Sequence, residues 1–165
     1  LKQAAKTMNF LTEHGISSYG ELESKLTAVS ARRDTAHAEI KRIESRSAEL
    51  ALVMKHAGTY RQLKPLYERY RKSNDKEKFL RGHESEIILF EAAARELKRL
   101  GAVPLPTTES MKTELANLNA EKERLLAEYK AARTEAQEYD TVKQNVDALL
   151  TVPKEQEQQR RHELE

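Results

Sequence analysis

The sequence lacks cysteine and tryptophan, and it contains little proline, glycine or aromatic residue. Without cysteine the chain can form neither disulfides nor thiolate metal sites. Its aromatic content is only 5%, and it has five Gly and four Pro, which is less large apolar material than a compact domain of 165 residues usually contains. There is no apolar run of the roughly 18 residues that a membrane span needs, and no signal-peptide pattern at the start. These absences favour an elongated protein that does not enter a membrane, and we expect it in the cytoplasm.

The residues that dominate are Glu, Lys, Ala, Leu and Arg, and 34% of the chain is charged. This composition is typical of long helices and coiled coils. The formal net charge is only +2, so any preference for polyanions must come from local clusters of cations. The chain starts at Leu1 rather than Met, and we therefore expect it to be a piece of a longer protein.

Two segments, 18–57 and 108–150, carry apolar residues at alternating steps of four and three. This spacing is that of heptad a and d positions, which face a partner helix in a coiled coil. Two stripes of equal character predict an all-α fold, in which an elongated antiparallel helical coiled-coil stalk carries a small helical tip subdomain. The predicted stalk interface consists of Leu22, Leu26, Val29, Ala36, Ile40, Ile43, Leu50, Met54, Leu115, Leu118, Leu125, Tyr129, Ala132, Ala136, Tyr139, Val146 and Leu150.

The matching of small residues predicts one register for this stalk. Placing Leu22 opposite Leu150 also places Ala36 opposite Ala136, where two small layers meet. It puts Arg33 beside Tyr139, where the guanidinium can stack on the ring. The polar residues on the stripes, such as Arg33 and Lys122, either extend from an ordinary seam to solvent or select the register.

The remaining segments give the other boundaries. Residues 1–15 predict an N-terminal helix that stops at Gly15, and Ser18 with Glu21 forms a capping box for the next helix. Residues 58–107 predict the helical tip, with a helix break at Gly58.

Within the tip, Pro65 either kinks a helix or starts a new one. Asn74 and Asp75 form a turn and can cap the next helix, which ends at Gly101. The run "EIILFEAAA" should form the centre of the tip core. Residues 151–165 are polar and predict either a helical extension or a linker.

The segment 59–81, "TYRQLKPLYERYRKSNDKEKFLR", has eight Lys or Arg against three Asp or Glu. On a helix its tyrosines share one arc of about 120°, and its cations lie on the complementary arc. The cations are either an ordinary solvated face or a surface that contacts DNA phosphates. The candidates for DNA contact are Arg61, Lys64, Arg69, Arg71, Lys72, Lys76, Lys78 and Arg81.

The sequence predicts no catalytic residue, metal site, cofactor or small-molecule substrate. A tyrosine attacks a phosphodiester only with help, usually from a metal ion, and no two of the five histidines have ligand spacing. His83 lies on the apolar line of Phe79, Ile87 and Phe90, which indicates a packed histidine. No glycine-rich phosphate loop or GxSxG motif is present.

Three phrases resemble the C-terminal helical region of relaxase/mobilization nucleases from conjugative or mobilizable elements of Gram-positive bacteria. They are "KTMNFLTEHGISSYGELESKL", "KFLRGHESEIILFEAAARELKRLGAVPLPT" and "VKQNVDALL", and the resemblance covers about residues 2–150. It implies a parent protein that nicks one DNA strand at a transfer origin, through a tyrosine and a histidine-bound metal in an N-terminal domain. The histidine cluster is absent from this chain, so the resemblance transfers no catalytic residue.

The resemblance therefore implies an accessory module that contacts DNA with low sequence specificity, other transfer proteins, or a second copy of the chain. The alternative is a purely structural coiled coil for protein–protein interaction or dimerisation. The two heptad stripes are the feature that motivates this second hypothesis.

Overall fold

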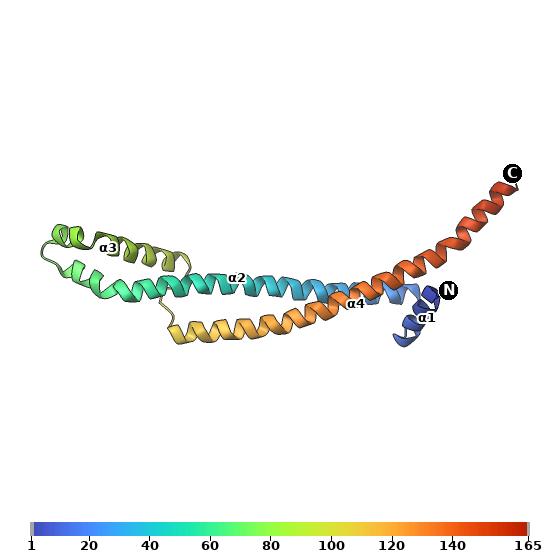
Figure 1. Cartoon of the computed structure of the whole chain (residues 1–165), viewed down its shortest axis with the longest axis horizontal. Coiled ribbons are helices and arrows are strands. Elements are labelled where there is room, and N and C mark those ends of the chain that lie inside the picture. Colours follow the sequence, from blue (N-terminus) through green and yellow to red (C-terminus); the bar gives the residue numbers. More distant parts are fainter. Residues whose placement is uncertain (1, 165) are drawn as a thin grey trace. The chain divides into compact units, whose positions relative to one another are not determined.

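The computed structural model describes residues 2–164, with the side chains of all of these except 152–157. Within residues 2–164, four helices are arranged as Figure 1 shows: α1 (Lys2–Glu13), α2 (Tyr19–Lys72), α3 (Lys76–Arg99) and α4 (Thr108–Glu163). Residues 2–164 contain no strand, which confirms the predicted all-α fold. Within the same range, no helix combines the length and the apolar character that crossing a lipid bilayer requires.

The chain divides into two compact units, and α2 and α4 contribute to both. The first unit holds Leu1–Ile40 and Arg124–Glu165, and the second holds Lys41–Glu123. In the first unit, Tyr19 of α2 contacts Asp147 of α4, and Arg32 further along α2 contacts Glu135. Residue numbers on α4 fall as those on α2 rise, so the helices are antiparallel, as predicted.

In the first unit, α1 packs on the α2–α4 pair and completes its core. The buried cluster joins Leu22 and Val29 of α2 to Ala136, Tyr139 and Val142 of α4. Phe10 and Leu11 of α1 pack against this cluster. Gly15, at φ 64°, turns the chain out of α1, and the Ile16 amide donates to the Leu11 carbonyl at 2.9 Å, which brings Ile16 into the core.

The ring of Tyr139 packs against α1, whereas the sequence predicted that Arg33 would stack on this ring. Phe10 lies edge-on to Tyr139 at 5.1 Å between ring centroids, and His14 stacks on Phe10 at 3.9 Å. Burial raises the pKa of the Tyr139 phenol. Arg33 instead pairs with Asp34 on its own helix at 3.0 Å, so the predicted stacking of Arg33 on Tyr139 is wrong.

In the second unit, α3 lies alongside the C-terminal part of α2 (Figure 1). Phe90 of α3 is buried and stacks between Tyr60 and Tyr67 of α2, with centroid distances of 4.8 and 4.3 Å. The run "EIILFEAAA" is only partly in this core, because Ile88 and Leu89 are 53% and 55% exposed. A helix that packs on one neighbour buries one face, and consecutive residues cannot all lie on it.

The predicted stalk register is wrong by one heptad. In the first unit His37 lies beside Tyr129 with 5.6 Å between ring centroids, and Val29 shares a buried cluster with Ala136. Ala36 is therefore level with Tyr129 and not with Ala136. Placing Ala36 opposite Ala136 would stabilise the helix pair only slightly. The observed register instead lets α1 cover Tyr139 and places opposite charges across from each other on α2 and α4.

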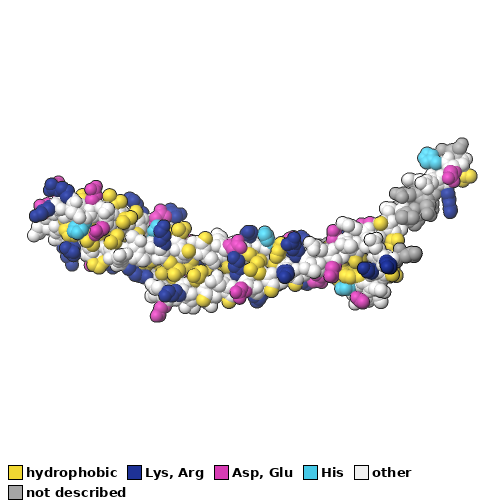
Figure 2. Space-filling model, in the orientation of Figure 1, with side chains coloured by type: hydrophobic (Ala, Val, Ile, Leu, Met, Phe, Trp, Pro, Cys, Tyr) yellow, Lys and Arg dark blue, Asp and Glu magenta, His cyan; other side chains and the backbone are white. Residues whose placement is uncertain are grey.

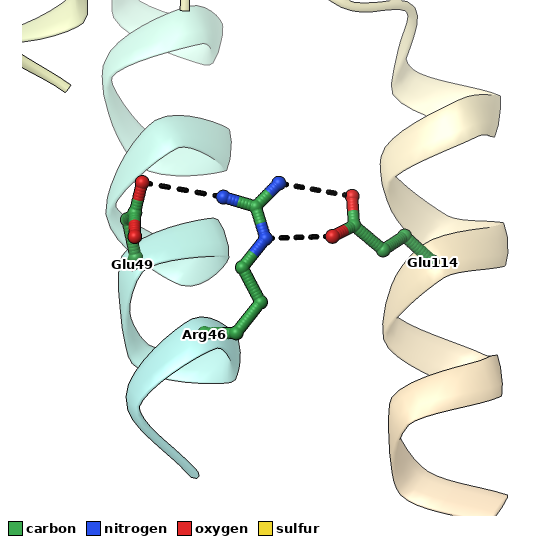
Figure 3. A network of polar contacts seen from close by, with 3 residues as sticks. All are labelled: Arg46, Glu49 and Glu114. Atoms are coloured by element: carbon green, nitrogen blue, oxygen red, sulfur yellow. Dashed lines mark hydrogen bonds and ion pairs between the residues drawn. The ribbon is translucent and has the colours of Figure 1, made fainter. Parts of the chain in front are cut away.

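A three-residue ion-pair network joins α2 to α4 in the second unit. Arg46 of α2 donates from Nε and Nη2 to the two carboxylate oxygens of Glu114 on α4, at 2.6 and 3.1 Å (Figure 3). Its Nη1 also donates to Glu49 at 3.2 Å. The hydrogen bonds from Arg46 lower the pKa of Glu114, and those to Glu114 raise the pKa of Arg46. Two parallel bonds to one carboxylate fix the relative height of the two helices better than a single contact does.

The expected helix break at Gly58 is wrong, because α2 continues through both Gly58 and Pro65 to Lys72. A glycine inside a helix costs only about 1 kcal/mol relative to alanine. The buried Ala57 and the stacking of Tyr60 on Phe90 oppose a break at this point. The boundary between the first stalk helix (18–57) and the tip (58–107) therefore has no counterpart in the backbone of α2.

Other helix ends follow the sequence signals. Asp75 accepts a hydrogen bond from the Lys78 amide at 3.1 Å and caps α3, which ends before Gly101 at φ 71°. The capping box at Ser18 is half formed: Ser18 Oγ accepts from the Glu21 amide, but the Glu21 carboxylate accepts from the Ser17 amide. Beyond residue 150, α4 continues to Glu163, and the side chains of 152–157 and residue 165 lie outside the described part of the predicted tail.

Most of the predicted stalk residues are buried, with one clear exception. Leu150 is 57% exposed, so its place in the interface is wrong; α4 has passed the end of α2 at this point, because the register differs. The polar residue Lys122 reaches Glu44 across the seam at 3.4 Å. The half-buried members are Leu26, Met54, Leu115, Tyr129 and Val146, and the buried ones are Leu22, Val29, Ala36, Ile40, Ile43, Leu50, Leu118, Leu125, Ala132, Ala136 and Tyr139.

Candidate nucleic-acid interface

The α2–α3 turn brings together cations from two helices. Ser73 Oγ accepts from the Asp75 amide and donates to the Asp75 carbonyl, which orders the three residues between Lys72 and Lys76. On the face that Figure 2 shows, Lys and Arg side chains gather at this end of the second unit, with some Asp and Glu side chains among them. All eight candidates for DNA contact are exposed, which leaves each of them accessible to a ligand.

Arg61 has a structural role that the sequence analysis did not predict. Its Nη1 donates to Thr108 Oγ1 at 2.7 Å, and its Nη2 donates to the Pro106 carbonyl at 2.5 Å. These bonds tie α2 to the residues that enter α4. The signal was weak in the sequence, because the partners are 45 and 47 residues away.

Three further cations rest against groups of the second unit. Lys64 Nζ lies 5.9 Å from the Tyr60 ring centroid, and the Arg69 guanidinium lies 5.6 Å from that of Phe79. Arg81 Nε donates to the Glu77 carbonyl at 3.4 Å. These contacts are weak at exposed positions and would compete little with a phosphate.

The other four candidates, Arg71, Lys72, Lys76 and Lys78, have no side-chain hydrogen bond or ion pair with any described residue of the chain. Arg71 and Lys72 lie in the last turn of α2, where the helix dipole favours cations. Lys76 and Lys78 lie in the first turn of α3, where the dipole disfavours them. The fold itself therefore gives no reason for a cation at these last two positions.

The tyrosines of the basic segment lie on the packing side of α2, as predicted. Tyr60, Tyr67 and Tyr70 are half-buried, and Tyr70 lies 6.0 Å from Phe79 of α3 between ring centroids. The two arcs adjoin, because Lys64 and Arg71 lie on the same stripe of α2 as Tyr60 and Tyr67. The rings hold α3 in place, and the cations remain on the outside.

His83 is packed, as predicted, at a local break in α3. Its ring lies 4.7 Å from Phe79, and its backbone departs from helical values with φ −138° and ψ 25°. Nδ1 is buried, lies 3.5 Å from Glu86 Oε2 and makes no hydrogen bond with a described residue. Across the described residues, no three His, Asp or Glu side chains converge in a way that would hold a metal ion.

Comparison with known proteins does not identify a family for this chain. The chain matches no protein-family model, no curated protein and no solved structure. The resemblance to the C-terminal region of relaxases therefore stays a prediction from the quoted phrases.

Proposed function

We propose that this chain is the accessory C-terminal helical module of a conjugative relaxase, and that it assists DNA transfer in the bacterial cytoplasm by contacting DNA phosphates. The DNA-nicking chemistry would belong to another part of the parent protein. Contacts with other transfer proteins or with a second copy of the chain are compatible with this role.

The observation that carries the proposal is the group of unpaired cations at the α2–α3 turn. Lys76 and Lys78 are exposed, have no anionic partner among the described residues, and oppose the dipole of α3. Cations that cost stability without pairing in the fold are expected at a functional surface. A polyanion such as DNA would supply the missing partners and release its own counterions.

The proposal is tested by titrating fluorescently labelled DNA with the chain at rising salt. Contact through about four phosphates predicts a slope of log K against log salt near −3 to −4 on duplex DNA. The triple variant Lys72→Gln/Lys76→Gln/Lys78→Gln should reduce the size of this slope by about 2 to 3. The matched control is Lys112→Gln/Lys130→Gln/Arg133→Gln, which removes three exposed cations of α4.

If the chain binds no DNA at low salt, or if both triple variants weaken binding equally, the turn is not a DNA-contact surface. All six positions are exposed, so we expect each variant to stay helical, and circular dichroism checks this.

A second candidate function is a coiled coil that binds a protein partner or dimerises. It is favoured by apolar exposure in the first unit, where Met8, Leu149 and Leu150 are 60%, 51% and 57% exposed. Met8 and Leu150 line an apolar cavity of about 360 Å³ together with Val146.

Light scattering on a size-exclusion column tests dimerisation. A dimer should dissociate in Leu150→Gln but not in Leu52→Gln, a matched control at an exposed leucine. A monomer mass at every concentration would remove the dimer version.

A further inference from the structure

A groove of about 470 Å³ lies between α2 and α3 in the second unit. Along α2 it is lined by Glu68 and by four residues that alternate between aromatic and basic: Tyr60, Lys64, Tyr67 and Arg71. Their spacing of four, three and four residues places them on one stripe of the helix. Arg95 of α3 lines the groove from the other side.

The floor of the groove is a stack of three rings. Phe90 is 5% exposed and lies nearly parallel to Tyr60 and Tyr67, with interplanar angles of 23° and 25°. Both tyrosines are half-buried, so part of each ring faces the groove. Rings held in place by packing bind a planar ligand at low entropic cost, because they lose little freedom when it arrives.

The cations of the groove are free to meet an anion. Lys64, Arg71 and Arg95 are exposed, and none has an ion pair or side-chain hydrogen bond with another described residue. Two carboxylates, Glu68 and Glu91, also line the groove. Three cations and two carboxylates suit a ligand that carries both a phosphate and hydrogen-bond donors, and exocyclic amino groups of nucleobases are such donors.

We infer that this groove binds single-stranded DNA, with an unpaired base against the Tyr60–Phe90–Tyr67 stack and its phosphate beside Lys64, Arg71 and Arg95. The inference rests on the proposed function, because it takes DNA as the ligand of the second unit. Duplex DNA cannot fill the groove in this way, since its bases are paired and stacked. Proteins that bind single-stranded nucleic acid without sequence preference combine a cationic groove with aromatic side chains on which bases stack.

The test uses three labelled probes of equal length with the whole chain: a single strand of mixed sequence, the same strand as a duplex, and a strand in which the central nucleotides are abasic. Stacking of one base predicts that the intact strand binds about 5- to 150-fold more tightly than the abasic strand. Phosphate contact alone predicts equal affinity for these two strands.

Two groove variants separate the base contact from the contacts at the turn. Lys64→Gln/Arg95→Gln should weaken the intact single strand and leave the duplex unchanged. Tyr67→Leu should bring the affinity of the intact strand down to that of the abasic one. The variant Lys72→Gln/Lys76→Gln/Lys78→Gln should weaken all three probes and keep the ratio between intact and abasic strands. If Tyr67→Leu disturbs the fold, the Lys64 and Arg95 variant carries the test, because both positions are exposed.

The outcomes distinguish this inference from the proposed function. Equal binding of the intact and abasic strands, with DNA binding retained, overturns the groove and leaves the proposed function standing. Absence of binding to all three probes overturns both. A duplex that binds as tightly as the intact strand and loses affinity in Lys64→Gln/Arg95→Gln also overturns the assignment to single strands.

Discussion

Tyr19, at the first residue of α2, donates a 2.6 Å hydrogen bond from its phenol to Asp147 Oδ1 on α4. The hydrogen bond to the carboxylate, together with burial and the nearby charge of Asp147, raises the pKa of Tyr19 from 10.0 to about 12. The contact joins α2 to α4 through two residues that are 128 positions apart in the sequence. It fixes the level at which α4 passes the start of α2.

The raised pKa of Tyr19 gives a prediction in alkaline solution. The phenol is protonated in the folded chain up to a higher pH than in the unfolded chain, so its contribution to stability is complete below about pH 10 and is lost as pH rises toward 12. Titration by NMR of the tyrosine Cζ signals should show one tyrosine near 12 that disappears in Tyr19→Phe. Asp147→Asn should bring this pKa back toward 10. A Tyr19 transition near 10 in the unmodified chain would contradict the hydrogen bond.

The Arg46–Glu114 pair should be coupled, but only modestly. Both side chains are about 40% exposed, with values of 40% and 41%, so solvent screens the interaction. A double-mutant cycle with Arg46→Met and Glu114→Gln should give a coupling energy of about 0.5–1 kcal/mol in urea unfolding near pH 7. The Arg124–Glu128 pair on one helix is the control, with about 0.3–0.5 kcal/mol expected.

The same pair should respond to acid in one direction. Because Arg46 lowers the pKa of Glu114, the stabilisation is present above the ordinary carboxyl pKa of 4.5 and is lost as pH falls through the lowered value. The coupling energy should therefore approach zero near pH 2. A coupling that persists in acid would mean that packing, and not charge, joins the two residues.

The register of the first unit can be measured by crosslinking, since the chain has no native cysteine. The structure places Ala36 level with Tyr129, so Ala36→Cys with Tyr129→Cys should form a disulfide under mild oxidation within one chain. Ala36→Cys with Ala136→Cys should not, because a heptad shift is about 10 Å along a helix and a disulfide needs Cα atoms within about 7 Å. The opposite result would restore the register expected from small-residue matching.

Two glycines should respond to alanine with opposite signs. Gly58 lies inside α2 and an added Cβ would meet no atom within 4 Å, so Gly58→Ala should raise the free energy of unfolding by about 0.5–1 kcal/mol. Gly101 has φ 71°, and an added Cβ would also meet no atom within 4 Å. Gly101→Ala should therefore lower the free energy of unfolding by about 1 kcal/mol through backbone strain alone. Thermal or urea unfolding measures both. A destabilised Gly58→Ala would indicate that α2 is interrupted there after all.

The residues that sequence reasoning missed share one physical cause. Val142 was not on the predicted stripe, yet it is buried because α1 packs on this side of α4. Val53 was also off the stripe, and it lies seven residues before Tyr60, on the face of α2 that stacks on α3. Heptad analysis describes contact between two helices, whereas a third helix widens the buried arc.

For the candidate interface, the sequence predicted which side chains would be basic and exposed, because charge and helical period are local properties. It could not predict that Arg61 would bond to the residues entering α4, or that Tyr60 and Tyr67 would enclose Phe90. Those contacts join segments that are distant along the chain.

The sequence by itself determined the all-α fold, the antiparallel pairing of α2 and α4, and the helix ends at Gly15, Asp75 and Gly101. Each depends on hydrophobic period, capping or backbone preference within a few residues. Only the tertiary structure decided the register of α2 against α4, the continuity of α2 through Gly58, and the groove between α2 and α3. Contacts such as Tyr19–Asp147 fix the register, and the packing of Phe90 on Tyr60 and Tyr67 holds α2 together and forms the groove. These contacts join residues that are distant along the chain, so no local sequence pattern specifies them.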